Sequence, residues 1–384
     1  MVMPVLDSPG VSTALAKPYR VLICDDQADV LEALRLLLRV HGHGAVTVQT
    51  PEALLLAART GAFDLILVDM NYMGDTTSGE EGLELLASLE AQGNRAPVMV
   101  MTAWGGVDLA VEAMRRGACD FIQKPWDNDR VLAAIRKQAA SERRRKSELE
   151  IAASVQQKLF PGKSRRLETI DYAGQCVAAR EVGGDYYDFL DVGDGKLGFV
   201  LADVSGKGVP AALLMANLQA CFRSQPAAGL LRLAEMLGTV NRHFYDSTGT
   251  ERFATLFFAI YDDRTRKLRY ANCGHVAPLL LRGDGRIERL DPTAALLGAF
   301  REWTSTEAET ELHSGDTLLL YSDGVTEAGA DWGQEFGEER LVGVVSEQQG
   351  RPAGMLVRAV VDAVADFSGG SRSDDVTVVG IRGI

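Results

Sequence analysis

Short apolar runs that alternate with amphipathic segments constrain the fold of residues 20–140 more than any other feature of the chain. The expected strands are Arg20–Cys24, Ala45–Thr47, Leu65–Val68, Val98–Met101 and Phe121–Ile122. The segments with helical spacing are Ala28–Arg39, Pro51–Arg59, Glu81–Glu90 and Val107–Arg116. Strands this apolar are buried on both faces, which is typical of a parallel sheet covered by helices. Because βαβ crossovers are right-handed, the sequence predicts an α/β fold with a doubly wound, five-stranded parallel sheet.

A different pattern begins after Pro161, as expected for a second domain in a chain of 384 residues. Hairpin turns separate strand-like runs at Leu197–Ala202, Ala254–Tyr261, Lys267–Ala271, Ala277–Leu281, Thr317–Tyr321 and Val376–Ile381. Helical segments interrupt these runs at Ala211–Arg223, Leu230–Tyr245 and Pro352–Ser368. Antiparallel strands with inserted helices predict an α+β sandwich rather than a second βαβ array.

Residues 128–160 connect the two patterns and contain no glycine or proline, so they predict one long helix. Two interpretations remain open: a solvated connecting helix, or a parallel coiled coil that makes the protein a homodimer. The candidate seam is Val131, Ile135, Leu149, Ala152 and Leu159, interrupted by Gln138, Glu142 and Arg145. We therefore expect a flexible tail at 1–18, domains at 19–140 and 161–384, and a helical linker at 128–160.

Composition excludes several classes of protein. The net charge of −13, from 40 Lys+Arg and 53 Asp+Glu, opposes a general role in nucleic-acid binding, which needs a basic surface. No apolar run reaches the roughly 18 residues that span a bilayer, and residues 1–18 lack the pattern of a secretory signal. The five cysteines contain no C-x-x-C pair, which indicates reduced thiols rather than disulfides or a zinc site. We expect a cytoplasmic protein with neither a membrane nor a nucleic-acid partner.

Acidic side chains follow the strands of the predicted parallel sheet. Asp25 and Asp26 come directly after the first strand, and Asp69 follows the third. Thr102 and Lys124 end the fourth and fifth strands. Because the carboxyl ends of parallel strands meet at one edge of a sheet, these side chains should converge. Three carboxylates, a hydroxyl and an ammonium predict a site for a hard cation and a phosphoryl group.

Four sequence blocks carry a resemblance here: Val-Leu-Ile-Cys-Asp25-Asp26, Leu-Ile-Leu-Val-Asp69-Met, Val-Met-Thr102-Ala and Phe121-Ile-Gln-Lys124-Pro. On them, residues 20–140 resemble the receiver domain of bacterial response regulators. The resemblance implies that Asp69 accepts a phosphoryl group from a sensor histidine kinase or a phosphotransfer protein. It also implies a Mg²⁺ site.

In the family's pattern, Asp26, Asp69 and the Asn71 carbonyl would bind that Mg²⁺, with Asp25 acting through water. Thr102 and Lys124 would bind the phosphoryl oxygens, and Phe121 would be the aromatic switch residue. One departure from the pattern is the extended Met73–Gly82 loop after the acceptor.

Acids recur in the second half: Asp185 and Asp323 adjoin a glycine, Asp203 lies three residues before Gly206, and Asp374 lies in a Ser-Asp-Asp run. An Asp-Gly pair in a hairpin is often only a turn residue, so a single one of these acids indicates little. Oxygen ligands without zinc-spaced histidines favour Mg²⁺ or Mn²⁺. Two such ions about 3.5–4 Å apart can activate a water for in-line attack on phosphorus without a protein nucleophile.

Ordered blocks span this half: Ala152-Ala-Ser-Val-Gln156-Gln-Lys-Leu-Phe-Pro161, Val182-Gly-Gly-Asp185-Tyr-Tyr-Asp188, Asp203-Val-Ser-Gly-Lys-Gly-Val-Pro-Ala-Ala212, Ala271-Asn-Cys-Gly-His275, Tyr321-Ser-Asp323-Gly-Val-Thr-Glu327 and Ser373-Asp-Asp-Val-Thr377. On these blocks, residues from about 150 to 384 resemble the SpoIIE/RsbU branch of the metal-dependent, protein phosphatase 2C-like serine/threonine phosphatases. The resemblance implies an α-β-β-α sandwich with two Mn²⁺ or Mg²⁺ ions. Asp203 would bridge the ions and Val204 would contribute its carbonyl. Asp323 and Asp374 would hold one ion, and Asp185 would support the other.

Three other motifs have simpler interpretations. Gly193–Gly198 matches a dinucleotide-binding fingerprint but precedes a strand, so it predicts a hairpin. Gly206-Lys207-Gly208 lacks the earlier glycine of a phosphate-binding P-loop. His275 is interpreted as a structural histidine, and Asp375 is the less favoured ligand of its Asp-Asp pair.

Together the two resemblances predict a response regulator whose output is a phosphoprotein phosphatase. The family implies a phosphorylated anti-sigma-factor antagonist of the STAS type as substrate, in a partner-switching pathway that frees or traps a sigma factor. Phosphorylation of Asp69 would reach the phosphatase through the 128–160 helix. The alternative is a non-enzymatic adaptor that binds a sigma-factor regulator through a phosphatase-like domain.

Overall fold

The computed structural model describes residues 17–72, 79–102, 107–162, 167–248, 251–330, 333–370 and 372–384. The chain divides into two compact units, Met1–Glu148 and Leu149–Ile384. Most of the predicted N-terminal tail and of the Met73–Gly82 loop lies outside the described residues. No helix within the described ranges is long and apolar enough to cross a membrane.

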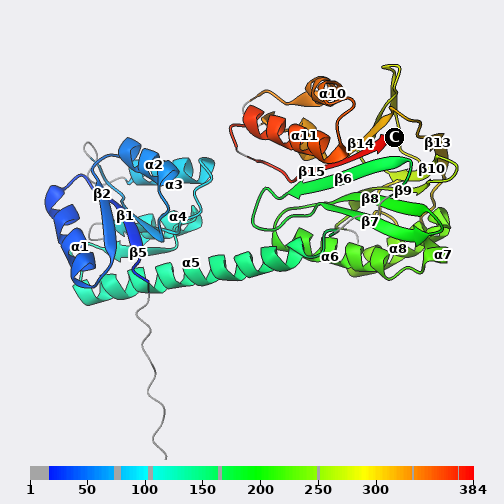
Figure 1. Cartoon of the computed structure of the whole chain (residues 1–384). Helices are drawn as coiled ribbons and strands as arrows, with labels where there is room; N and C mark the ends of the chain where they lie inside the picture. The colour runs from blue at the N-terminus through cyan, green and yellow to red at the C-terminus, as the bar shows by residue number, and fades with distance from the viewer. Residues whose placement is uncertain are drawn as a thin grey trace, which may run out of the picture. The chain divides into compact units, whose positions relative to one another are not determined.

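The first unit contains one parallel sheet in the order β2-β1-β3-β4-β5 (Figure 1). Its strands are β1 (Arg20–Cys24), β2 (Gly44–Val48), β3 (Leu65–Asp69), β4 (Val98–Thr102) and β5 (Asp120–Gln123). The connecting helices are α1 (Ala28–Val40), α2 (Pro51–Thr60), α3 (Glu80–Ala91) and α4 (Val107–Arg115). The predicted doubly wound, five-stranded sheet is confirmed.

Burial on both faces explains why the strands of this unit are so apolar. Leu22, Ile66 and Val68 face a core beneath α2 and α3. Their neighbours Ile23 and Leu67 face a second core beneath α1 and the helix after β5. Successive side chains of a strand point to opposite faces, so both registers must be hydrophobic here.

Helix α5 (Asn128–Gln157) follows β5 as one continuous helix (Figure 1). Its first turns belong to the receiver-like unit, where Val131 and Ile135 are buried in the core. At the C-terminal side of the helix, Leu159 packs on a core of the second unit. Three of the five candidate seam residues therefore pack on the cores of the two units and are not free to form a coiled coil. The exposed apolar pair on α5 is Ile151 and Val155 instead, which leaves only a short surface for a coiled coil.

The second unit is built from two antiparallel five-stranded sheets, in the orders β13-β10-β9-β8-β7 and β12-β11-β14-β15-β6. The first sheet contains β7 (Tyr186–Gly193), β8 (Lys196–Val204), β9 (Ala254–Asp262), β10 (Lys267–Cys273) and β13 (Ala308–Glu311). The second contains β6 (Ile170–Val177), β11 (Leu279–Leu281), β12 (Ile287–Arg289), β14 (Thr317–Tyr321) and β15 (Val376–Gly383). The helices are α6 (Val209–Arg223), α7 (Ala227–Leu230), α8 (Leu233–Thr248), α9 (Asp323–Thr326), α10 (Gly337–Glu347) and α11 (Ala353–Phe367).

Three cores stack the layers of this unit into the predicted α-β-β-α sandwich (Figure 1). Alternation along β9 shows the arrangement: Phe258 faces the core under α6 and α8, whereas Phe257 faces the core between the sheets. On the far side, α10 and α11 cover the sheet that contains β14 and β15. The fingerprint-like Gly193–Gly198 segment is the β7–β8 hairpin, as predicted.

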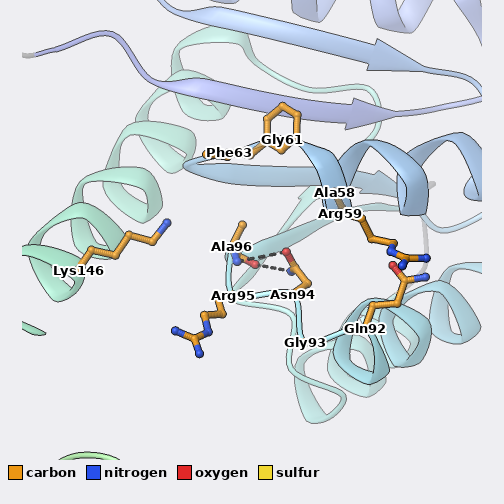
Figure 2. Close-up of a pocket in the computed structure, with 11 residues that line it drawn as sticks. Ala58, Arg59, Gly61, Phe63, Gln92, Gly93, Asn94, Arg95, Ala96 and Lys146 are labelled. Carbon is orange, nitrogen blue, oxygen red and sulfur yellow. Dashed lines mark hydrogen bonds between the residues drawn. The ribbon is translucent and has the colours of Figure 1, made fainter. Parts of the chain in front are cut away.

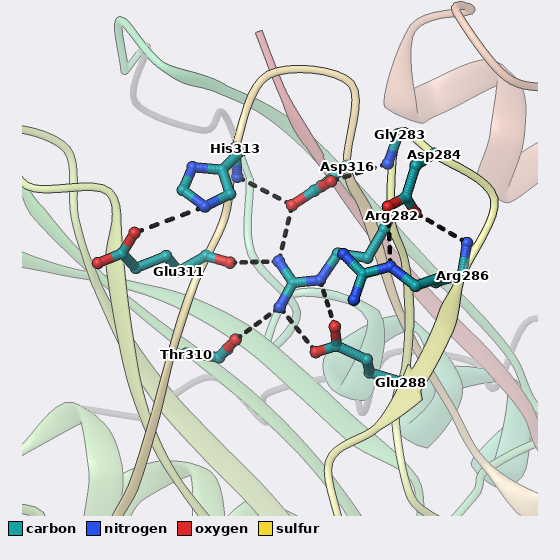
Figure 3. A network of polar contacts seen from close by, with 9 residues as sticks. All are labelled: Arg282, Gly283, Asp284, Arg286, Glu288, Thr310, Glu311, His313 and Asp316. Atoms are coloured by element: carbon teal, nitrogen blue, oxygen red, sulfur yellow. Dashed lines mark hydrogen bonds and ion pairs between the residues drawn. The ribbon is translucent and has the colours of Figure 1, made fainter.

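A half-buried arginine, Arg282, holds the β11–β12 hairpin against the loop before β14 (Figure 3). The Arg282 guanidinium donates two hydrogen bonds to the Glu288 carboxylate, at 2.8 and 2.7 Å. It also donates to the Asp316 carboxylate at 2.8 Å and to the Glu311 carbonyl at 2.7 Å. The second oxygen of Asp316 accepts from the Gly283 backbone N–H at 2.9 Å. One side chain therefore pairs with two carboxylates and cross-links two loops.

Replacing Arg282 by methionine is expected to lower the free energy of unfolding of the second unit by about 2–3 kcal/mol. The substitution leaves nearly buried Asp316 without its counter-charge, while half-exposed Glu288 can turn to water. Urea or thermal unfolding followed by circular dichroism measures the change. Arg286→Met is the matched control, because the Arg286–Asp284 pair is exposed and should contribute little. Equal effects of the two substitutions would contradict this account of the network.

Candidate functional site

The carboxyl ends of the receiver-like sheet bring three acids together. Asp25 and Asp26 follow β1, Asp69 ends β3, and one carboxylate oxygen from each lies within 4.8 Å of the others. Asp25 and Asp69 are almost fully buried. The convergence predicted from strand ends is thus present in the structure.

Lys124 lies between two of these acids. Its ammonium is 2.7 Å from Asp25 Oδ2 and 3.0 Å from Asp69 Oδ1. Burial, and then the charge of Asp25, raise the pKa of Asp69 to about 6 despite the lysine. The single ammonium of Lys124 therefore does not neutralise the cluster of three carboxylates.

Two oxygen atoms at this edge of the sheet have no hydrogen-bond donor among the described residues. Asp26 Oδ1 and Asn71 Oδ1 are buried and have no hydrogen-bond partner in the described structure. Buried polar atoms are normally satisfied, so unpartnered acceptors beside excess negative charge fit a cation. An all-oxygen set of this kind suits Mg²⁺.

The other residues predicted for this site lie nearby on the sheet. Thr102, the last residue of β4, is buried, and its carbonyl accepts from the Lys124 backbone N–H at 2.7 Å. Phe121 lies on β5, is 43% exposed, and contributes to an apolar hollow with Val111 and Met114 of α4. The aromatic ring is therefore placed on the surface rather than in the acid cluster.

A separate cavity of about 380 Å³ lies at the amino-terminal ends of β3 and β4, opposite the carboxyl ends that carry the acids (Figure 2). It is lined by the segments that precede β3 and β4, with cationic side chains at Arg59, Arg95 and Lys146. The Asn94 side chain closes its own loop through hydrogen bonds with Ala96. The lining contains none of the three clustered acids, so this cavity is distinct from their site.

In the second unit, four acids come from both sheets. Asp185 precedes β7 and Asp203 lies near the end of β8, in one sheet. Asp323 follows β14 and Asp374 shortly precedes β15, in the other sheet. Their negative charges act on one another. Besides burial, the charges of Asp323 and Asp374 raise the pKa of Asp203, and the charge of Asp203 raises the pKa of Asp185. Both sheets of the sandwich thus supply carboxylates that lie near enough for the charge of one to raise the pKa of another.

The pKa values show how strongly this site lacks positive charge. Burial, followed by the charges of Asp323 and Asp374, raises the pKa of Asp203 to about 7. Burial and the charge of Asp203 raise the pKa of Asp185 well above its usual range. Carboxylates that repel one another this much need bound cations to stay ionised near neutral pH. The donor set, oxygen only, fits Mg²⁺ or Mn²⁺.

Neighbouring residues fix the Asp185 carboxylate and its loop. Thr377 donates its hydroxyl to Asp185 Oδ2 at 2.5 Å. Asp375 accepts from the backbone N–H of Ala179 at 2.8 Å and of Gly184 at 2.7 Å. The Asp375 oxygens are therefore occupied by backbone donors, in keeping with its interpretation as the less favoured ligand.

Glycine is required where this loop crosses β8. A Cβ atom on Gly184 would lie 2.7 Å from the Val204 carbonyl oxygen, and one on Gly183 would overlap the Asp375 carboxylate. The Gly-Gly-Asp sequence thus allows the backbone to approach the strand that carries Asp203.

Sequence reasoning missed a lysine at the edge of this site. The Lys207 ammonium is 2.8 Å from Asp374 Oδ2 and 2.7 Å from the Ser373 carbonyl oxygen. Lys207 lies between Gly206 and Gly208, whose φ angles of 100° and 72° turn the chain sharply after β8. The available signal is the Gly206-Lys207-Gly208 motif, which begins three residues after Asp203 and which the sequence alone excludes only as a P-loop.

His275 is buried, and its interpretation as a structural residue stays a prediction. Its Nδ1 is 2.7 Å from the Thr255 hydroxyl, and its backbone N–H donates to the Asn272 side chain at 2.8 Å. Burial lowers the pKa of His275 to about 4, so the ring is neutral at physiological pH.

The raised pKa values predict how stability depends on pH and metal. In the metal-free protein the folded state holds protons on Asp69 and Asp203 more tightly than the unfolded chain does. The free energy of unfolding should therefore fall as pH rises from about 4 to about 7. Divalent cations bind the ionised carboxylates, so Mn²⁺ should raise the melting temperature more at about pH 7.5 than at about pH 5. Calorimetry with and without Mn²⁺ tests this, and equal shifts at both pH values would contradict it.

Comparisons with known proteins show the family of each unit. Residues 21–136 match the model of the response regulator receiver domain, and residues 193–383 match that of stage II sporulation protein E. The chain is 30% identical over 239 residues to phosphoserine phosphatase RsbU of Bacillus subtilis, covering 62% of this chain and 70% of that protein. The chain belongs to the SpoIIE/RsbU family of protein serine/threonine phosphatases. Its first unit is a receiver domain.

Two further relatives cover one unit each. The transcriptional regulatory protein FixJ of Bradyrhizobium diazoefficiens is 36% identical over 115 residues, which are 30% of this chain and 54% of FixJ. The SiaA-PP2C domain of Pseudomonas aeruginosa has a TM-score of 0.55 at 21% identity, covering 64% of this chain and 98% of that domain. The latter likeness shows that the SpoIIE-type unit has the protein phosphatase 2C fold.

Proposed function

We propose that this chain is a response regulator in which phosphorylation of Asp69 controls the hydrolysis of phosphoserine or phosphothreonine on a partner protein. The observation that carries the proposal is that burial and then the charges of Asp323 and Asp374, from the other sheet, raise the pKa of Asp203. Burial and the charge of Asp374 likewise raise the pKa of Asp323, although the Lys207 ammonium contacts Asp374. An adaptor that only bound a partner would gain nothing from this arrangement, because mutually repelling, partly buried carboxylates reduce stability.

In the phosphatase domain, each acid has a distinct role. Asp203 would bridge two Mn²⁺ or Mg²⁺ ions, beside the Val204 carbonyl. Asp323 and Asp374 would hold one ion, and Asp185 would support the other. Bound ions of this kind lower the pKa of a shared water and neutralise phosphoryl oxygens. Lys207, next to Asp374, adds a cation at the edge where a phosphorylated side chain would enter.

In the receiver domain, an Asp69 carboxylate oxygen would attack phosphorus in a phosphohistidine of a sensor kinase or phosphotransfer protein. The P–N bond breaks, an acyl phosphate forms, and the imidazole leaves and takes up a proton. Asp25, Asp26 and Asn71 would hold the Mg²⁺ that neutralises the transferred group. Lys124 already touches Asp69, so its ammonium is placed to bind a phosphoryl oxygen, together with the Thr102 hydroxyl.

Helix α5 supplies the covalent connection for regulation, because it begins in the receiver domain and ends in the phosphatase domain. RsbU suggests the substrate class: a phosphorylated STAS-type anti-sigma-factor antagonist, in a partner-switching pathway. The exposed Ile151 and Val155 on α5 support a proposed homodimer through this helix.

The test is hydrolysis of a phosphoserine peptide and of a small aryl phosphate by the full chain. Removal of divalent cations with a chelator should stop turnover, and Mn²⁺ or Mg²⁺ should restore it. Absence of turnover with either metal and either substrate, by a folded protein, would favour the adaptor.

A further inference from the structure

The loop that carries Asp185 is held from outside its own sheet by the last turn of α5. Gln156, in that turn, is 9% exposed. Its side-chain N–H donates to the Gly183 carbonyl oxygen at 2.8 Å, and its Oε1 accepts from the Gly183 backbone N–H at 3.1 Å. One amide side chain therefore satisfies both backbone groups of a buried glycine, in the geometry of a β-bridge.

Gly183 is two residues before Asp185, so the position of Gly183 sets the position of that carboxylate. The next residue, Gly184, lies against the Val204 carbonyl oxygen. A shift of the Gly183 backbone would thus move both Asp185 and the chain that crosses β8. No other described residue forms a hydrogen bond with the Gly183 backbone.

The end of the helix is itself fixed to the phosphatase domain. The Gln219 side chain of α6 donates to the Leu159 carbonyl at 3.3 Å, and the Phe160 ring stacks on Tyr187 with centroids 5.4 Å apart. Gln156 thus projects from a docked turn, which limits the rotamers available to its amide.

We propose that Gln156 is a positioning residue: its paired hydrogen bonds to Gly183 hold Asp185 where the phosphatase domain binds its divalent cations. The inference rests on the proposed function of the Asp185–Asp203–Asp323–Asp374 site. It assigns to the helix that precedes the domain a direct role in forming that site.

The experiment titrates Mn²⁺ into the metal-free full chain and follows binding by calorimetry, so the readout does not depend on turnover. Gln156→Leu removes both hydrogen bonds, whereas Gln156→Glu keeps the acceptor for the Gly183 N–H and loses the donor. Outer partners of metal ligands typically contribute about 10- to 100-fold to metal affinity. We expect Gln156→Leu to weaken Mn²⁺ binding by that factor, and Gln156→Glu to weaken it as well.

The neighbouring Gln157 offers a matched control, because it is exposed on the same turn. Gln157→Leu should bind Mn²⁺ as the wild type does. Turnover of Gln156→Leu should recover when Mn²⁺ is raised, since the defect lies in metal affinity. A residue with only a structural role would lower the metal-free melting temperature without changing Mn²⁺ affinity.

Wild-type affinity in Gln156→Leu would overturn the inference. If Gln156→Leu does not fold, wild-type affinity in the isosteric Gln156→Glu would overturn it equally. Failure of the proposed function gives a different result: the wild type then binds Mn²⁺ but hydrolyses no phosphoserine, while the affinity comparison among variants stands.

Discussion

Replacing Asp203 by asparagine should lower metal-dependent turnover by at least about 100-fold, because loss of a direct ligand should exceed the 10- to 100-fold effect of its outer partners. Asp203 is the acid whose charge interacts with Asp323, Asp374 and Asp185 together. The substitution removes one of the repelling charges, so the metal-free variant should be more stable than the wild type near neutral pH. A lower rate combined with a higher metal-free melting temperature separates loss of a ligand from misfolding.

Asp362→Asn is the matched control, since Asp362 is an exposed acid on α11 of the same domain. It should retain wild-type turnover and wild-type response to Mn²⁺. Turnover of Asp203→Asn within a few-fold of the wild type, on a phosphoserine peptide, would mean that these acids are not the metal site.

Replacing Asp69 by alanine should abolish the response of the phosphatase to receiver phosphorylation. Beryllofluoride, which mimics a phosphoryl group on aspartate, is expected to change wild-type turnover by about 5- to 150-fold, the range typical of coupling between two sites. The physical reason is the Lys124 ammonium, which contacts Asp25 and Asp69 in this structure. A phosphoryl group on Asp69 supplies new oxygens for Lys124 and Thr102, so the polar contacts at this edge must change.

Asp69→Ala treated with the same reagent controls for any direct effect of fluoride on the phosphatase site. Glu90→Ala, an exposed acid on α3, should respond as the wild type does. A beryllofluoride effect of equal size in wild type and Asp69→Ala would exclude control through the receiver domain.

The parallel sheet could be predicted from the sequence because its central strands β1, β3 and β4 are buried on both faces and are therefore almost entirely apolar. Strands at the edge of the second unit lack that signal. β12 is a three-residue strand, Ile287–Arg289, and β13 alternates exposed with half-buried positions. β6 contains Gly174, against which the Tyr187 ring packs, so a residue that usually weakens a strand is required there. The local amino-acid composition of these three segments does not predict strands. They form strands because of their tertiary contacts.

The candidate metal-binding acids could be predicted because carboxylates at strand ends form a recognisable pattern. The residues that hold them were not found. Gln156, Lys207 and Thr377 act through contacts across about 27, 167 and 192 positions of sequence, and no local pattern encodes such pairs. The candidate seam of α5 shows the same limit of local pattern: Val131 and Ile135 have heptad spacing, but both are buried in the receiver core.

The central claim is that one chain couples an aspartate phosphorylation site to a metal-dependent protein phosphatase. It is tested most directly by the rate of phosphate release from a phosphoserine peptide, measured for the full chain in Mn²⁺ with and without beryllofluoride. We predict turnover that requires the metal, changes with beryllofluoride, and loses that change in Asp69→Ala. A rate that is the same with and without beryllofluoride, from a metal-loaded and active wild type, would contradict the claim.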